Sequence, residues 1–361
     1  MTTSTPPGID RVILRDPAQL IASLPYLLGF CPTESVVLLG HLSPGTAIGL
    51  ILRADLPPRE LFAIQVDSLV PRFLHEAHAG VTAVIVGGDP DDCGPPHADF
   101  VDELRRALAE HELHLFHPLW TAEVAAGAPW ACYRDPDCGG ILPDPRDTVI
   151  AAATTRAGYV VFRSRDEVAA LFEPRSRRAL ERRAALLTRS PAPLCDPEIT
   201  STASGDPGAE LSSGVLLERA AAEVRAAFLR HRRREGPPND AQAVRLAHAL
   251  SLVPIRDACL ATAVPLGSPL ACEAEEVWLA LVRELPAPHR AGAACLLAYS
   301  TLLRGDGALA GMAVANAVEA DPGSLLASLL HSVWNAGVDP GKLIGLATGN
   351  GGVDLGLAGA T

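Results

Sequence analysis

Apolar residues in the first half of the chain occur in short runs between turn residues, as they do in buried β-strands. Residues 35–40 and 47–52 are two such runs, and the Ser-Pro-Gly turn between them indicates a hairpin. Residues 81–86 form the clearest run, and residues 113–121 and 130–133 predict further strands. This half of the chain is therefore expected to build a sheet.

Helical periodicity separates these strands. Residues 60–78 and 99–110 carry apolar side chains at the three- and four-residue spacing of an amphipathic helix. Asp16 followed by Pro17 marks the start of an earlier helix, because an acidic cap and a proline in the first turn favour helix initiation. Hairpin strands followed by strand, helix and strand predict a mixed sheet covered by helices, which is an α+β or α/β fold.

The second half of the chain follows the helical period throughout. Short breakers separate its helices, which indicates antiparallel neighbours in an all-helical bundle. Residues 289–303 and 307–320 place their small residues as one tetratricopeptide-like hairpin does. Between the halves lies a stretch rich in Ser, Thr, Pro, Gly and Asp, which is typical of a linker. The expected division is an α/β domain over 11–189, a linker over 190–214, a helical domain over 215–344 and a flexible tail over 345–361.

Composition and charge narrow the class of protein. The chain has 361 residues, 48% of them apolar and 20% charged, which is enough for two domains with their own cores. The net charge of −12 argues against binding to nucleic acid or to an anionic membrane surface. No signal peptide or apolar stretch of about 20 residues is present. We therefore expect a cytoplasmic protein that binds no nucleic acid and no membrane.

The cysteines offer the best candidate chemistry. Cys132 and Cys138 lie six positions apart and flank two aspartates, so they could hold a metal, form a redox pair or pin the ends of a polar loop. Zinc needs four ligands, and no histidine follows these cysteines at the usual spacing. We favour the polar loop and assign no metal site, and no cofactor is identified.

Two further segments are candidate ligand-binding sites. Gly87, Gly88 and Asp89 follow the clearest strand, and glycines there allow a ligand to approach the backbone at the carboxyl end of a sheet. An acidic, solvated loop is the simpler interpretation and is favoured. Tyr26, with Glu34 and Ser35, brackets the apolar turn before the first strand, and the polar tips of that turn could line a pocket or plug the end of the sheet.

The histidines give a weaker signal. His75 and His78 share a helix face, while His111, His114 and His117 span a helix-to-strand junction, and no HExxH motif or acidic partner completes either set. We interpret all five as surface or half-buried side chains. No Gly-x-Ser-x-Gly elbow is present.

Several long segments resemble one known family. They are residues 13–20, 24–37, 130–138, 164–167, 255–258 and 303–310. In sequence and order they are similar to the actinobacterial domain-of-unknown-function 4192 family, and the similarity extends from residue 13 to about residue 340. The resemblance implies a cytosolic actinobacterial protein of unknown activity.

The function that fits these observations is that of a ligand- or partner-binding, regulatory protein. Its α/β half would hold a small ligand or a partner, and its helical half would dock another protein. The alternative is an enzyme with its site at the carboxyl ends of the sheet, near residues 87–92 and Cys132. The sequence leaves open whether the chain is an enzyme.

Overall fold

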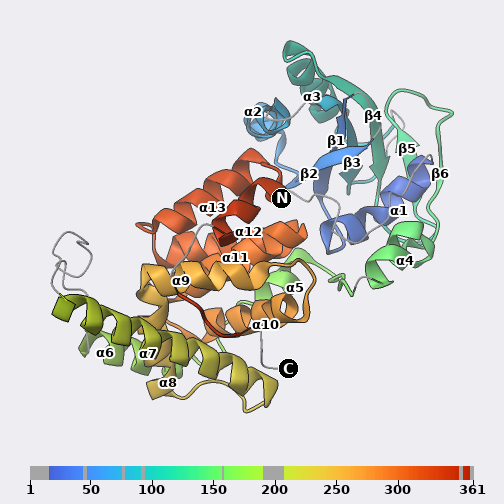
Figure 1. Cartoon of the computed structure of the whole chain (residues 1–361). Coiled ribbons are helices and arrows are strands. Elements are labelled where there is room, and N and C mark those ends of the chain that lie inside the picture. Colours follow the sequence, from blue (N-terminus) through green and yellow to red (C-terminus); the bar gives the residue numbers. More distant parts are fainter. Residues whose placement is uncertain are drawn as a thin grey trace. The chain divides into compact units, whose positions relative to one another are not determined.

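The computed structural model divides into two compact units (Figure 1). It describes residues 16–43, 47–74, 78–90, 94–156, 158–189, 207–348 and 353–357. The sheet unit comprises Met1–Ala169, Gly305–Leu309 and Ser332–Asp339. The helical unit comprises Ala170–Arg304, Ala310–His331 and Pro340–Thr361.

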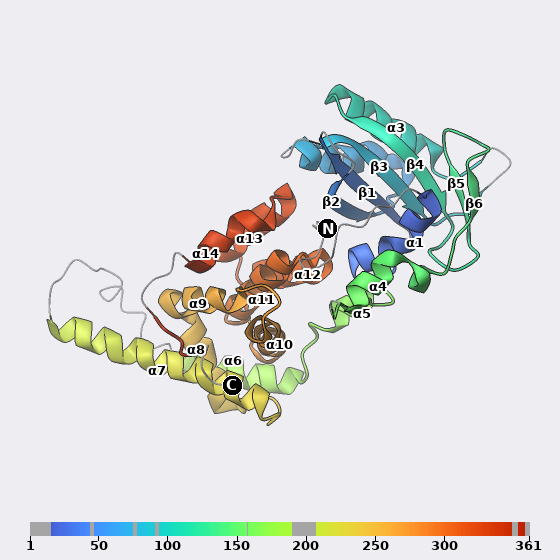
Figure 2. The ribbon, with the colours of Figure 1, turned by 45° about the vertical axis from the view of Figure 1, so that its right-hand side comes forward.

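Six strands form the mixed sheet that the sequence predicts (Figure 2). They are β1 (Ser35–Leu42), β2 (Ile48–Asp55), β3 (His78–Val86), β4 (His114–Thr121), β5 (Pro129–Cys132) and β6 (Gly139–Ile141). Their spatial order is β2-β1-β3-β4-β5-β6. β3 and β4 are parallel, and every other neighbouring pair is antiparallel. The expected hairpin of the first two strands is confirmed.

One face of this sheet packs on α2 (Phe62–Leu69) and α3 (Ala98–Glu110). Alternation along β1 sends Val36 and Leu38 into this core, where they meet buried side chains of α3 such as Phe100 and Leu104. The helix expected over residues 60–78 is shorter than predicted. Pro71 has no backbone N–H to donate, and the chain there continues as a 3-10 turn, η2 (Val70–Leu74).

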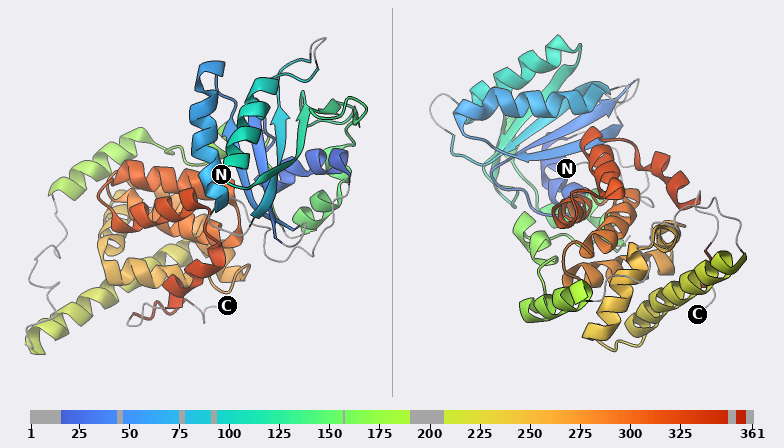
Figure 3. Two further views of the ribbon diagram at one scale, coloured as in Figure 1. Left: turned by 90° about the horizontal axis from the view of Figure 1, so that it is seen from above. Right: turned by 90° about the vertical axis from the view of Figure 1, so that its left-hand side faces the viewer.

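The opposite face of the sheet lies towards α1 (Pro17–Leu28) and α4 (Val149–Arg156) (Figure 3). The Asp16 carboxylate accepts from the Ala18 N–H at 3.0 Å, which confirms the predicted cap. The helix continues past Pro25 to Leu28, and the residue that follows, Gly29, has a φ of 81°. A left-handed glycine is a common helix C-terminus because it lacks a Cβ.

The remaining helices have these bounds: α5 (Arg165–Ala170), α6 (Arg177–Arg189), α7 (Pro207–Arg232), α8 (Asp240–Ser251), α9 (Val253–Leu260), α10 (Pro269–Glu284), α11 (Arg290–Arg304), α12 (Gly307–Ala320), α13 (Leu325–Ala336) and α14 (Ile344–Thr348). Apart from Ala170, α5 lies in the sheet unit. The two helices of the expected hairpin, α11 and α12, are present and meet at Gly305, whose φ is 81°. α10 packs along α11, and Trp278, Tyr299 and Phe228 are fully buried in the helical core. No helix in the parts of the chain that the structure describes could cross a membrane.

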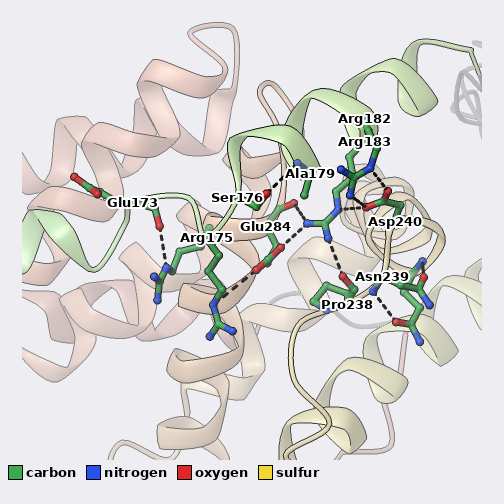
Figure 4. Close-up of polar contacts among 12 residues, drawn as sticks. Glu173, Arg175, Ser176, Ala179, Arg182, Arg183, Pro238, Asn239, Asp240 and Glu284 are labelled. Atoms are coloured by element: carbon green, nitrogen blue, oxygen red, sulfur yellow. Dashed lines mark hydrogen bonds and ion pairs between the residues drawn. The ribbon is translucent and has the colours of Figure 1, made fainter.

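The observed division differs from the expected α/β domain over 11–189, because α6 belongs to the helical unit. Arg183 explains the difference (Figure 4). Its guanidinium is buried and donates to the Asp240 carboxylate at 3.0 Å, to the Glu284 carbonyl at 2.7 Å and to the Pro238 carbonyl at 2.8 Å. It also forms an ion pair with the Glu284 carboxylate. Residues 163–189 contain eight arginines, and Arg183 among them is a buried side chain that connects α6 to α8 and α10.

The linker and the tail differ from expectation where the structure describes them. Residues 190–206 lie outside the described residues, but α7 begins at Pro207, so the last part of the expected linker is helical. The tail expected to be flexible over 345–361 continues α14 to Thr348. Leu355 and Leu357 are buried, and Arg225 donates to the Leu355 carbonyl at 3.4 Å. Apolar burial therefore holds the described part of the tail.

Candidate functional site

Three possible metal ligands converge in the sheet unit. They are His117 on β4, Cys132 at the end of β5 and Cys138 just before β6. The ligand atoms of all three side chains lie within 4.8 Å of one another. The Cys138 Sγ and His117 Nε2 atoms are 3.9 Å apart. Within the described ranges this is the one cluster of three such side chains.

A bulge in β4 determines which face His117 occupies. Leu115 and Trp120 both lie in the core under α2 and α3, although they are five positions apart and simple alternation would place them on opposite faces. The pairing with β3 shifts between these two residues, so that Val81 pairs with Leu115 but Thr82 with His117. The extra residue, Phe116, turns His117 to the face opposite α2 and α3.

Cys132 reaches the same face through the pairing of β5 with β4. It lies opposite Leu119, which is two residues from His117 and therefore on the same side of β4. The neighbouring Ala131 and Tyr133 pack against the core on the other face. The Tyr133 hydroxyl donates to the Pro96 carbonyl at 2.6 Å, and this bond anchors the end of β5.

A tight turn brings Cys138 back beside Cys132. The Cys132 N–H donates to the Cys138 carbonyl at 2.9 Å, and the Cys138 N–H donates to the Asp135 carbonyl at 3.0 Å. The Asp135 carboxylate accepts from the Asp137 N–H at 3.0 Å. Both aspartates thus lie in the turn, and Asp135 caps it, while the two sulfur atoms are left facing His117. The turn geometry fits the polar-loop interpretation, but it also assembles a set of donors.

Burial shifts the pKa values of His117 and Cys138. It lowers the pKa of His117, and the positive charge of Arg134 lowers it further. It raises the pKa of the Cys138 thiol, with a smaller contribution from Cys132. A neutral imidazole has the free lone pair that a metal needs, and a bound cation would favour loss of the thiol protons. The site is therefore suited to a metal cation that binds the His117 lone pair and replaces the thiol protons of the two cysteines.

Apart from Tyr26, the other candidates lie at the carboxyl end of β3. Ser35 is fully buried, and its hydroxyl donates to the Thr33 carbonyl at 2.5 Å and accepts from Arg53 Nε at 2.9 Å. Both hydrogen-bonding roles of Ser35 are thus used within the fold. Glu34 has a φ of 41° and covers Gly87, where a Cβ atom would come within 2.6 Å of its carboxylate.

Gly88, Asp89 and Tyr26 add nothing to the contact between Glu34 and Gly87. Gly88 lies beside Pro96, and Asp89 is exposed. Tyr26 is half-buried on α1, where burial and the nearby Asp144 carboxylate raise its pKa. Residues 91 and 92 lie outside the described residues.

The two groups of candidates do not meet in one site. The Gly87 N–H donates to the Thr121 carbonyl at the carboxyl end of β4. His117 precedes Thr121 by four residues, which is about 13 Å along a strand. The residues of the single site expected near residues 87–92 and Cys132 thus lie in two separate places. One is the carboxyl end of β3, and the other is the cluster of His117, Cys132 and Cys138.

The sequence analysis groups His117 with His111 and His114 and looks for a histidine after the cysteines, so it does not connect His117 with Cys132 and Cys138. The signal that could place His117 is the five-residue separation of Leu115 and Trp120. It indicates a bulge only when both residues are known to lie in the same core. Of the other histidines, His75 lies outside the described residues, and His78 is buried beside the Phe73 carbonyl.

The fold and site define a two-unit α+β protein with a Cys₂His cluster on one face of its sheet. A family model described as a domain of unknown function, DUF4192, matches residues 17–341. The chain belongs to this family, as the resemblance of its segments indicates. Neither the curated proteins nor the solved structures gave a match.

Proposed function

We propose that the chain is a ligand-binding protein whose sheet unit binds a thiophilic divalent metal ion, zinc in the first instance, through His117, Cys132 and Cys138. The observation that carries this proposal is the 4.8 Å limit on the distances among the three donor atoms. In a tetrahedral zinc site with normal bond lengths, neighbouring sulfur and nitrogen ligands lie about 3.6–3.8 Å apart. The 3.9 Å between Cys138 Sγ and His117 Nε2 is already close to that value.

The chemistry of the donors supports zinc over calcium or magnesium. Sulfur and imidazole nitrogen are the ligands that zinc prefers, whereas the two hard cations take oxygen. Two of the donors come from the paired strands β4 and β5, and a hydrogen-bonded turn holds the third. Rigid elements keep donors close without a large loss of entropy on binding.

Three protein ligands leave one position of a tetrahedral ion open to water or a small molecule. A metal-bound water has a lowered pKa and is a nucleophile near neutral pH. If the chain is an enzyme, this open position favours a catalytic site at His117, Cys132 and Cys138 over one at the carboxyl end of β3. A protein partner for the helical unit and a cytoplasmic location stay predictions.

Metal binding is tested by native mass spectrometry of the full chain, purified under reducing conditions and then offered zinc. We expect one zinc ion per chain, and no stoichiometric zinc in Cys132→Ser, Cys138→Ser or His117→Ala. Cys272→Ser is the matched control, because Cys272 is an exposed free cysteine in the helical unit. Circular dichroism shows whether each variant is folded. A folded wild-type chain that retains no zinc would refute the proposal.

A further inference from the structure

We propose that this site is also a peroxide-sensitive switch, in which oxidation joins Cys132 to Cys138 in a disulfide and releases the metal. The inference rests on the proposed function, since only a bound metal can be released. Its geometric basis is independent, because it concerns the distance between the two cysteines rather than the presence of His117.

The backbone already places the two cysteines as a disulfide requires. The Cys132 N–H donates to the Cys138 carbonyl at 2.9 Å, as in a pair of residues on adjacent strands. Such pairs have Cα atoms about 4.5–5.5 Å apart, within the range of about 4.4–6.8 Å found in disulfides. The two Sγ atoms lie within 4.8 Å of each other. Side-chain rotation can therefore form the bond without movement of the backbone.

The two thiols differ in access, which gives each a role. Cys132 is only 6% exposed, whereas Cys138 is half-buried at the end of the turn. A small oxidant in solution therefore reaches the Cys138 sulfur first. The buried Cys132 sulfur is positioned to attack the oxidised Cys138 sulfur. The Arg134 N–H donates to the Cys132 Sγ at 3.4 Å and holds that sulfur beside the turn.

The reaction balances with hydrogen peroxide as the oxidant. As a zinc ligand Cys138 would be a thiolate, even though burial raises the pKa of its free thiol. This thiolate attacks one peroxide oxygen, the O–O bond breaks, and a sulfenic acid and hydroxide form. The Cys132 thiolate then attacks the Cys138 sulfur, the S–S bond forms and a second hydroxide leaves. Two thiolates have lost two electrons, and one peroxide has become two hydroxides. A metal that loses both anionic ligands keeps only His117 and dissociates.

Other cysteines of the described chain provide a contrast. Cys259 and Cys295 are buried singly, and burial raises the pKa of Cys295 to about 12. A thiol of such high pKa holds little thiolate and oxidises slowly. Cys31 and Cys272 are more accessible but are free cysteines outside the cluster. They can become oxidised without forming the proposed disulfide.

The test treats zinc-loaded protein with equimolar hydrogen peroxide and follows zinc release with a chromogenic chelator. Trypsin cuts after Arg106, Arg134 and Arg146, so the disulfide would join peptide 107–134 to peptide 135–146. Each of these peptides contains a single cysteine, which makes the cross-link unambiguous. We expect one cross-link for each zinc released and recovery of zinc binding after reduction with dithiothreitol. Cys272→Ser is expected to behave as wild type.

The outcomes separate the two proposals. Zinc that is bound but stays bound under peroxide, or leaves without the cross-link, overturns the switch and leaves metal binding intact. A chain that binds no zinc before treatment overturns the proposed function instead, and the switch with it.

Discussion

Arg183 in the helical unit is buried and His117 in the sheet unit is half-buried, and the polar atoms around the two side chains differ. Each of the three guanidinium nitrogens of Arg183 has a protein acceptor, and Asp240 and Glu284 balance its charge. At His117 the ring nitrogen and the Cys138 sulfur are 3.9 Å apart, a long contact between weakly bonding groups.

This comparison distinguishes a structural cluster from a ligand site. A buried polar group costs free energy unless its hydrogen-bonding capacity is satisfied. The Arg183 cluster satisfies that requirement within the protein and connects three helices (Figure 4). The donors at His117 are close enough to share one cation, and the cation would supply the strong bonds that they do not make to one another.

The largest effect is expected for Arg183→Met. This change leaves the buried Glu284 carboxylate without its closest cation, and breaking a buried ion pair in this way costs about 3–5 kcal/mol of unfolding free energy. Urea unfolding followed by circular dichroism measures the loss. Arg182→Ala is the matched control, because Arg182 also pairs with Asp240 but is 59% exposed. We expect it to cost less than about 1 kcal/mol. Equal losses would show that the Arg183 cluster is not an integral part of the fold.

A smaller effect is expected from zinc itself. A ligand that binds only the folded state stabilises it by about 2.7 kcal/mol when its free concentration is a hundred times the Kd. Thermal unfolding of the wild-type chain should therefore shift upward with added zinc, and that of Cys138→Ser should not. Arg183→Met should retain the shift, since Arg183 and Cys138 belong to different units. Loss of the zinc shift in Arg183→Met would contradict the separation of the two clusters.

Gly87→Ala tests whether the contact between Glu34 and Gly87 is independent of the cluster of His117, Cys132 and Cys138. Gly87 has a φ of 119°, and an added Cβ would approach the Glu34 carboxylate to 2.6 Å, so we expect a loss of about 1–3 kcal/mol in unfolding free energy. Zinc affinity should not change, because Gly87 lies beside Thr121, about 13 Å along β4 from His117. Calorimetric titration with zinc checks this, and a tenfold loss of affinity would connect the two places.

The sequence predicts most of the fold because its elements follow local rules. Val36 and Leu38 alternate as a half-buried strand requires, and Asp16 caps a helix as its position indicates. What it misses depends on contacts between distant segments. Arg183 is adjacent to the exposed Arg182 in the sequence, and nothing local distinguishes the two arginines. Only the fold brings Glu284 to Arg183. His117 changes face through a bulge that no local pattern marks. Cys132 and Cys138 were predicted as a pair, because a short turn joins them.

The smallest predicted effect concerns the acid side of the Arg183 cluster. Hydrogen bonds from Arg182 lower the pKa of Asp240 below its usual value, and those from Arg183 add to the shift. A carboxyl whose folded pKa is below its unfolded value stabilises the fold at higher pH, and the contribution is lost as pH falls from about 4 through the folded pKa. We therefore expect the unfolding free energy of the wild-type chain to fall more steeply below about pH 4 than that of Asp240→Asn. Urea unfolding at a series of acidic pH values measures both slopes, and the difference between them removes any constant cost of the substitution. Parallel curves would mean that Asp240 is no more ionised in the folded chain than in the unfolded one, and that Arg183 is held by Glu284 and the Pro238 carbonyl without help from the charge of Asp240.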